Sequence, residues 1–244
     1  MTEAIVTKGL TCRYPGVLAV DSLDLTIRAG ELFALLGVNG AGKTTTIRML
    51  TCLKRPTSGT AEILGHDLVK EPMAVRSLTD LSPQETAVAR QLSVRENLEM
   101  MAGIYGAPKR EAAGRTDELL EKLGLAAVSR KRASTLSGGT QRRLSIAMAL
   151  VSRPKILFLD EPTLGLDVLA RRELWNLIES LKGNVTIVLT THYLEEAQAL
   201  SDRIGVMAEG RLRACGSAEE LRALTSTSTL EEAFLRLAAG KEAV

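Results

Sequence analysis

The chain has 244 residues, enough for one large domain or for one domain that carries a subdomain. Hydrophobic residues make up 45% of it and charged residues 25%, which is typical of a globular protein with a buried core. The 31 basic and 29 acidic side chains leave a net charge of +2, so we expect no nucleic acid partner. The pair Arg142 and Arg143 is accordingly interpreted as part of a solvated helix face.

Targeting and membrane-spanning signals are not evident in the sequence. The first residues show no basic stretch followed by an apolar one, so we expect no secretory signal. Apolar runs such as 156–159 and 185–189 have the length of strands, too short to cross a membrane. The three cysteines, Cys12, Cys52 and Cys215, lack metal-binding spacing, and we expect each to be a small buried side chain in a reducing compartment. A cytoplasmic location is the resulting expectation.

The first part of the chain alternates short apolar strands with turns. Residues 31–36 are predicted to form a buried strand, followed by a glycine-rich turn and a helix over about 43–50. Residues 55–59 contain Pro and Gly and predict another turn, after which 60–64 resume as a strand. The glycine-rich turn therefore lies between a strand and a helix.

The pattern becomes helical from about residue 82 to 151. Residues 93–96 read Ser-Val-Arg-Glu, a capping box that starts a helix running to about residue 105. Residues 111–123 show helical spacing that stops at Gly124. We expect a helical subdomain over about 84–150, inserted within an α/β domain.

Strand-length apolar runs return at 155–159 and 185–189, separated by a predicted helix over about 170–181. Such alternation of strand and helix implies a parallel sheet covered by helices.

The last part of the sequence, after Gly216, predicts two short helices. Each begins with a capping box, at residues 217–220 and 229–232. No internal repeat occurs in the sequence. We therefore expect a single domain over 1–216 followed by a short helical tail over 217–244.

One glycine-rich motif points directly to chemistry. Residues 37–44 read Gly-Val-Asn-Gly-Ala-Gly-Lys-Thr, a full match to G-x-x-x-x-G-K-[ST]. The glycines let the backbone curl so that successive N–H groups point at phosphate oxygens, and the following helix adds the positive end of its dipole. Lys43 places a charge near the β- and γ-phosphates, and the Thr44 hydroxyl can bind Mg²⁺. The motif predicts a nucleotide site.

Two later apolar strands end in residues that suit the same site. The run 156–159 is followed by Asp160 and Glu161, at the end of a strand, where open α/β sheets bind ligands. Asp160 is positioned to hold Mg²⁺, and Glu161 to polarise an attacking water. The run 185–189 leads to His192, a candidate contact for the γ-phosphate and the water; a purely structural histidine is the alternative.

A second anion-binding helix start is predicted in the middle of the chain. Ser137, Gly138 and Gly139 precede a helical run and would form a helix N-terminus suited to an anion. A single phosphate-loop site has no need of a second cradle. We infer that this one serves a nucleotide held mainly by another subunit.

Together these motifs resemble those of the ATP-binding subunits of ABC transporters, over nearly the whole chain. The matching segments are 37–45 for Walker A, 84 for the Q-loop, 136–140 for the LSGGQ signature, 156–161 for the Walker B strand and catalytic glutamate, 163–167 for the D-loop, and 192 for the switch histidine. Tyr14 falls where the family places an aromatic that stacks on adenine; a packing role is the alternative. The chain departs from the family at Val38, Cys52 and Thr140, where Pro, Gly and Gln are usual.

The resemblance implies an α/β fold. It would comprise a P-loop NTPase core of the RecA type, an N-terminal antiparallel β subdomain and an inserted helical subdomain. It also implies ATP and Mg²⁺ as cofactors. The implied catalytic residues are Glu161, His192, Lys43 and Gln84. The implied ATP contacts are Tyr14, Gly37, Asn39, Gly40, Ala41, Gly42, Lys43, Thr44, Thr45, Ser137, Gly138 and Gly139. The implied metal ligands are Thr44, Gln84 and Asp160.

The resemblance further implies two kinds of partner. A second ATP-binding subunit, expected to be an identical copy, would form a head-to-tail dimer around two ATP molecules. A transmembrane permease would hold the protein on the inner face of the cell membrane. Residues 191–197 and 229–237 resemble the drug-resistance and sodium-export branch, so a drug, an ion or a lipid-like compound would move outward. The alternatives are an importer ATPase, a non-transport ABC ATPase of translation or DNA repair, and a non-hydrolysing regulator.

Overall fold

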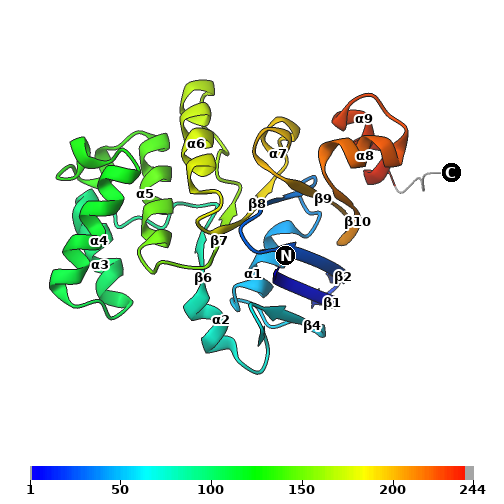
Figure 1. Cartoon of the computed structure of the whole chain (residues 1–244), viewed down its shortest axis with the longest axis horizontal. Helices are drawn as coiled ribbons and strands as arrows, with labels where there is room; N and C mark the ends of the chain where they lie inside the picture. The colour runs from blue at the N-terminus through cyan, green and yellow to red at the C-terminus, as the bar shows by residue number, and fades with distance from the viewer. Residues whose placement is uncertain (1, 240–244) are drawn as a thin grey trace. The chain divides into compact units, whose positions relative to one another are not determined.

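The computed structural model describes residues 2–239 (Figure 1). The chain forms two compact units. Of the described residues, the first unit contains 2–76 and 182–239, and the second contains 77–181.

The first unit begins with an antiparallel sheet whose strand order is β2-β1-β4-β5. Its strands are β1 (Glu3–Tyr14), β2 (Val17–Arg28), β4 (Ser58–Ile63) and β5 (His66–Asp67). Buried and exposed residues alternate along much of β1 and β2, as expected where one face of a sheet covers a core. These two strands are 12 residues each, longer than the short strands that the sequence predicts here.

The same unit contains the strands around the predicted nucleotide loop. The strand β3 (Leu32–Leu36) pairs in parallel with β8 (Thr186–Thr191) on one side and with β9 (Arg203–Ala208) on the other. The strand β10 (Arg211–Gly216) pairs antiparallel with β9. Every residue of β3 and β8 is buried, although three of the six residues of β8 are threonines. The helices of this part are α1 (Lys43–Leu50), α7 (Leu194–Leu200), α8 (Ala218–Thr225) and α9 (Leu230–Ala238), and α2 (Pro72–Leu78) ends the N-terminal segment.

The second unit combines a pair of parallel strands with helices. The strand β6 (Thr79–Ser82) pairs with β7 (Ile156–Asp160). The helices are α3 (Val94–Ile104), α4 (Lys109–Lys122), α5 (Gly138–Leu150) and α6 (Val168–Leu181), with 3₁₀ turns η1 (Ala126–Val128) and η2 (Ala133–Thr135). The helices α3, α4 and α5 lie side by side (Figure 1) and enclose a core that includes Leu98, Leu120 and Leu144.

The predicted α/β class and most predicted elements are confirmed. The capping boxes at Ser93, Ser217 and Thr229 all form, and each starts a helix. The domain boundaries 1–216, 84–150 and 217–244 stay predictions, and residues 240–244 lie outside the described part of the chain. The expectation that all three cysteines are buried is wrong: Cys12 is buried, but Cys52 is half-buried and Cys215 is exposed on the strand β10. Within residues 2–239, none of the helices has both the length and the apolar character needed to cross a membrane.

Candidate active site

The glycine-rich loop of residues 37–44 connects the buried strand β3 to the helix α1. Gly37 is buried, whereas residues 38–40 are exposed. Gly42 caps α1 with a φ of 102°, a left-handed conformation that favours glycine. A Cβ atom at Gly42 would overlap the carbonyl oxygen of Ala19, and one at Gly37 would overlap the carbonyl oxygen of Met207. The loop is therefore held at close range by neighbouring backbone, and glycine is required at both positions.

The side chain of Lys43 lies against this loop. It is only 5% exposed, and its Nζ atom donates hydrogen bonds to the carbonyl oxygens of Gly37 at 2.7 Å and Val38 at 3.2 Å. The ammonium group is thus held at the start of the loop. The first turn of α1 carries no acidic residue, so no carboxylate there neutralises the positive partial charge at the start of the helix.

His192 follows directly after β8, next to the loop. Leu36 and Thr191 are partners in the parallel register of β3 and β8, and the Gly37 N–H donates to the Thr191 carbonyl at 3.2 Å. The His192 ring is half-buried and lies 4.1 Å from the ring of Tyr193, centroid to centroid. The first unit therefore brings His192 close to the start of the predicted phosphate loop.

Tyr14 lies at the end of β1, where it pairs with Val17 across the turn to β2. The Nζ atom of Lys54 is 4.7 Å from the centroid of the Tyr14 ring, a cation–π contact. One face of this half-buried ring thus contacts a cation.

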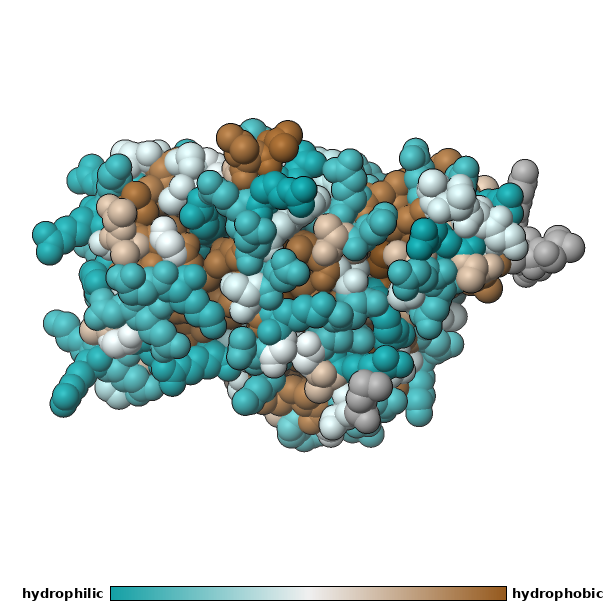
Figure 2. Space-filling view, turned by 45° about the horizontal axis from the view of Figure 1, so that its top comes forward, coloured by the Kyte–Doolittle hydropathy of each residue, from teal (hydrophilic) through white to brown (hydrophobic). Residues whose placement is uncertain are grey.

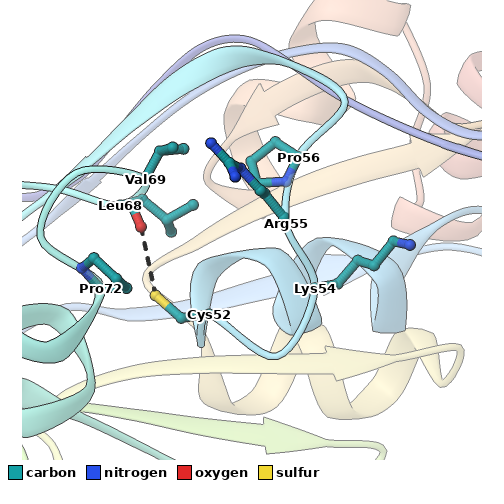
Figure 3. A pocket seen from close by; sticks show the side chains of 7 residues that line it. All are labelled: Cys52, Lys54, Arg55, Pro56, Leu68, Val69 and Pro72. Atoms are coloured by element: carbon teal, nitrogen blue, oxygen red, sulfur yellow. Dashed lines mark hydrogen bonds between the residues drawn. The ribbon is translucent and has the colours of Figure 1, made fainter.

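A small cavity of about 200 Å³ is lined by residues between positions 52 and 72, and none of these lining residues is a predicted site residue. Its lining residues are Cys52, Lys54, Arg55, Pro56, Leu68, Val69 and Pro72. Figure 3 shows that Lys54 points away from the other side chains, while the Cys52 thiol approaches the Leu68 carbonyl at 3.8 Å. Burial raises the pKa of this thiol, so it stays protonated. The cavity is smaller than typical ligand pockets of about 300–1,000 Å³.

In the second unit, two buried carboxylates end the strand β7. Asp160 is its last residue and is 4% exposed, and Glu161 follows it and is 5% exposed. Glu161 has a φ of 48°, which places its backbone in the left-handed region that non-glycine residues adopt at some cost. The carboxylates thus lie at a sharp turn in the chain at the end of a buried strand, as predicted.

The prediction that Arg142 lies on a solvated helix face is wrong. Arg142 is only 4% exposed. Its guanidinium donates to the carbonyl oxygens of Pro162 and Pro83, each at 2.6 Å, and to those of Asp160 and Glu161. No local pattern marks its burial, because its partners are backbone carbonyls that lie far from it in the sequence.

Gln84 follows the strand β6 and is exposed. Its neighbour Pro83 is held by the bond from Arg142, and Ser82 shares a hydrogen bond of 2.9 Å with Ser145 of α5. The second unit therefore fixes the backbone next to Gln84 and the backbone of Asp160 and Glu161 through the same helix.

Ser137 caps the helix α5, as the sequence predicts. Its hydroxyl accepts from the Thr140 N–H at 3.4 Å and shares a bond of 2.9 Å with the Thr140 hydroxyl. Ser137 and Gly138 are exposed, and a Cβ atom at Gly139 would lie 3.1 Å from the Cβ of Ala170. Thr140, which replaces the usual Gln, thus supports the cap.

The predicted residues fall into two groups, one in each unit. The first unit brings together the loop, with Gly37, Asn39, Gly40, Ala41, Gly42, Lys43, Thr44 and Thr45, and His192. The second holds Gln84, Ser137, Gly138, Gly139, Asp160 and Glu161. Among the described residues, no cluster of three or more His, Cys, Asp or Glu side chains could hold a metal. Mg²⁺ needs no such cluster, because it binds one or two protein oxygen ligands together with substrate phosphates and water. Thr44 in the first unit, and Asp160 and Gln84 in the second, each carry an oxygen atom of the kind that Mg²⁺ prefers.

The protein has the features of a P-loop nucleotide-binding protein: a buried strand leads into a glycine-rich loop that packs against neighbouring backbone, and the loop leads into a helix that begins with a buried lysine. The family model described as ABC transporter matches residues 20–164. The chain therefore belongs to the ABC transporter family as an ATP-binding domain that hydrolyses ATP. Proteins of this family dimerise and work with membrane permease subunits.

Individual relatives agree with this. The daunorubicin resistance ATP-binding protein DrrA3 of Streptomyces coeruleorubidus is 45% identical over 229 residues, which are 93% of this chain and 72% of that protein. The daunorubicin/doxorubicin resistance ATP-binding protein DrrA of Streptomyces peucetius is 44% identical over 230 residues, 94% of this chain and 70% of that protein. The predicted resemblance, drug-resistance branch and ATPase activity are confirmed, and the alternatives are not favoured.

Solved structures agree on the fold. The structure of an ATP binding subunit of an ABC transporter matches with a TM-score of 0.84 at 28% identity, covering 96% of this chain and 99% of that one. The structure of cbiO1 from Clostridium perfringens, part of the ABC transporter complex cbiONQ, matches with a TM-score of 0.83 at 28% identity, covering 91% of this chain and 92% of that one. The predicted fold, with its P-loop core, is confirmed.

Proposed function

We propose that this chain hydrolyses ATP to drive the outward transport of a drug-like solute through a separate permease. The similarity to daunorubicin resistance ATP-binding proteins, about 45% identity over more than nine-tenths of the chain, is the observation that carries this proposal. The permease would hold the chain on the inner face of the cell membrane. The nature of the solute depends on contacts in that permease.

In the proposed mechanism, the resemblance to ABC ATPases assigns each of these residues a role in ATP hydrolysis. The loop and Lys43 bind the β- and γ-phosphates, and Tyr14 contacts adenine. Thr44, Gln84 and Asp160 would hold Mg²⁺, which supplies charge neutralisation on the phosphates when bound. Glu161 accepts a proton from the attacking water while His192 contacts the γ-phosphate. The burial of Lys43 beside the loop supports its role, because a cation shielded from water interacts more strongly with phosphate.

The proposed working form is a head-to-tail dimer in which the second copy completes each site. Ser137, Gly138 and Gly139 of one copy would contact the ATP held by the loop of the other. Apolar side chains exposed after Glu161 support this: Leu164 is 39% exposed, Val168 71% and Leu169 77%. Hydrophobic side chains also project from an otherwise mostly hydrophilic face in Figure 2. Burial of such side chains against a second copy would favour association.

Drug efflux from living cells tests the proposed direction and solute class. In cells whose own copy of the gene is changed to Lys43→Ala or Glu161→Gln, we expect daunorubicin to accumulate and its efflux to slow severalfold. A Lys70→Ala variant serves as the control, because that side chain is 82% exposed and pairs only loosely with Asp67. Unchanged efflux in both site variants, with their ATPase activity lost, would refute the export of this solute class.

A further inference from the structure

Arg142 makes an unusual set of contacts for a helix residue next to a signature motif. Its guanidinium donates to four backbone carbonyls and reaches two loops, the one at Pro83 and the one at residues 160–162. A guanidinium is planar, carries five N–H donors and keeps its charge at all physiological pH values. It therefore suits a place where several carbonyl oxygens converge in a buried region.

The three contacted residues at 160–162 include the proposed general base. The backbone of Glu161 has a φ of 48°, a conformation that a non-glycine residue keeps only where its surroundings impose it. The Arg142 bonds reach the carbonyls before, at and after this residue. They therefore stabilise the turn that decides where the Glu161 side chain points.

The same guanidinium also fixes the loop that carries Gln84. Its Nη1 atom donates to the carbonyl of Pro83, the residue before Gln84. Arg142 itself lies in the second turn of α5, which begins after its cap Ser137. One buried side chain thus joins the backbone beside Gln84, the turn at Glu161 and the helix that starts at the signature.

We infer that Arg142 is a positioning residue for ATP hydrolysis, which holds the turn at residues 160–162 so that the Glu161 carboxylate meets the attacking water. Arg142 acts through Glu161 and does not contact the nucleotide. The inference rests on the proposed role of Glu161 as the base. It predicts an effect on the rate of hydrolysis and little effect on ATP binding.

The test compares Arg142→Lys and Arg142→Gln with the wild-type protein. Lysine keeps the charge but offers its donors from a single atom, so it can satisfy only part of the carbonyl set. We expect kcat to fall by about tenfold to a hundredfold, because small misplacements of a catalytic group cost rates of this order. The KM for ATP and the affinity for a fluorescent ATP analogue should change less than about twofold, since uniform binding is unaffected.

Arg153 provides the matched control on the same unit. Its guanidinium pairs with Glu118 at 3.3 Å, and both side chains are 62% exposed. We expect Arg153→Lys and Arg153→Gln to keep the wild-type kcat. Thermal unfolding of every variant is measured, and rates are compared per active site well below the melting temperature. If Arg142→Gln does not fold, the Arg142→Lys variant decides the question.

A double-mutant cycle with Glu161→Gln separates this inference from the proposed function. If Arg142 acts through Glu161, adding Arg142→Lys to Glu161→Gln should slow single-turnover hydrolysis no further. The inference would be overturned if the rate losses of the two single variants multiplied in the double variant. It would also be overturned if Arg142→Lys kept the wild-type kcat, or if its KM for ATP rose as its kcat fell. A Glu161→Gln variant that hydrolyses ATP at the wild-type rate would instead overturn the assignment of the base.

Discussion

Gly42 shows how tightly the phosphate loop is built. Its φ of 102° lies outside the range that side-chain-bearing residues adopt readily, and the space beside it is filled by the Ala19 carbonyl and the Met207 side chain. The loop is therefore held on one side by backbone that cannot move without disturbing β2 or β9. Two independent requirements, conformation and space, select glycine at this position.

We expect Gly42→Ala to lower both stability and nucleotide affinity. The backbone strain and the overlap together should cost about 1–3 kcal/mol of unfolding free energy. A loop displaced from its N–H geometry should bind ATP at least about tenfold more weakly. Chemical denaturation and equilibrium binding of a fluorescent ATP analogue measure the two effects.

Gly114 offers the matched control. It lies inside the helix α4, and no atom lies within 4 Å of the place that a Cβ would take. We expect Gly114→Ala to raise stability by about 0.5–1 kcal/mol, because alanine favours a helix interior. Equal stability losses in the two variants would show that the space and conformation at Gly42 do not matter.

Sequence patterns predict single residues well when the requirement is local. The glycines and Lys43 of the loop follow a fixed spacing, so the sequence identified them directly. Arg142 was placed wrongly because its partners are carbonyls at residues 83 and 160–162, from 18 to 59 positions away in the sequence. Nothing in an arginine pair on a helix reports which member faces such carbonyls.

Asp80 joins the ends of two helices to a strand in the second unit. It lies on β6 and accepts hydrogen bonds from Tyr105, after α3, at 2.6 Å and from Ser152, after α5, at 2.8 Å. Burial is the largest influence on this carboxyl group and raises its pKa above the ordinary value of 3.8, although the hydrogen bonds lower it in part. Burial and the bond to Asp80 also raise the pKa of Tyr105, which stays a donor.

The raised pKa of Asp80 predicts a pH dependence with a definite sign. Above the unfolded pKa, the folded protein binds more protons at this site than the unfolded chain, so its stability falls as the pH rises through the folded pKa. Asp80→Asn removes this loss. We therefore expect the melting temperature of Asp80→Asn, measured relative to wild type by thermal unfolding, to increase between about pH 4 and about pH 7.

Asp67 provides a contrast of opposite sign. Its side chain is half-buried, and hydrogen bonds from the backbone N–H groups of Lys70 and Val69 lower the pKa of its carboxyl group. A lowered pKa contributes stability that is present above the unfolded pKa and is lost as the pH falls through the folded pKa. The melting temperature of Asp67→Asn relative to wild type should therefore decrease as the pH rises from about 2 to about 4. Thermal unfolding from about pH 2 to about pH 7 covers both transitions, and trends of the same sign in the two variants would contradict the opposite directions of the two pKa shifts.

Helices with local start signals were predicted more accurately than strands without them. The helices α3, α8 and α9 begin directly after the caps Ser93, Ser217 and Thr229. The strands β9 and β10 were not predicted. In β9, Gly205 weakens the strand pattern, yet a Cβ there would meet the ring of Phe33, so the strand depends on packing against β3. Such contacts form between distant residues and leave no local pattern.

The chain as a whole carries two sets of site residues whose proposed use differs. The loop, Lys43 and His192 belong to the unit that would hold the nucleotide, while Ser137 to Gly139 would serve the nucleotide of a second copy. The sequence already indicated this division, because one phosphate site does not need two cradles. The exposed Ser137 and Gly138 and the exposed apolar residues Val168 and Leu169 agree with that proposal.

The proposed ATP-bound dimer is tested most directly with the Glu161→Gln variant after incubation with ATP and Mg²⁺. Light scattering measures its mass, and nucleotide extraction measures its nucleotide content. Because ATP would bind while its hydrolysis is blocked, we predict a stable dimer that retains two unhydrolysed ATP molecules. Lys43→Ala in the same variant should bind no ATP and stay a monomer. A Glu161→Gln protein that remains monomeric with ATP would contradict the proposed dimer, and one that releases ADP as fast as the wild type would contradict the role of Glu161 as the base.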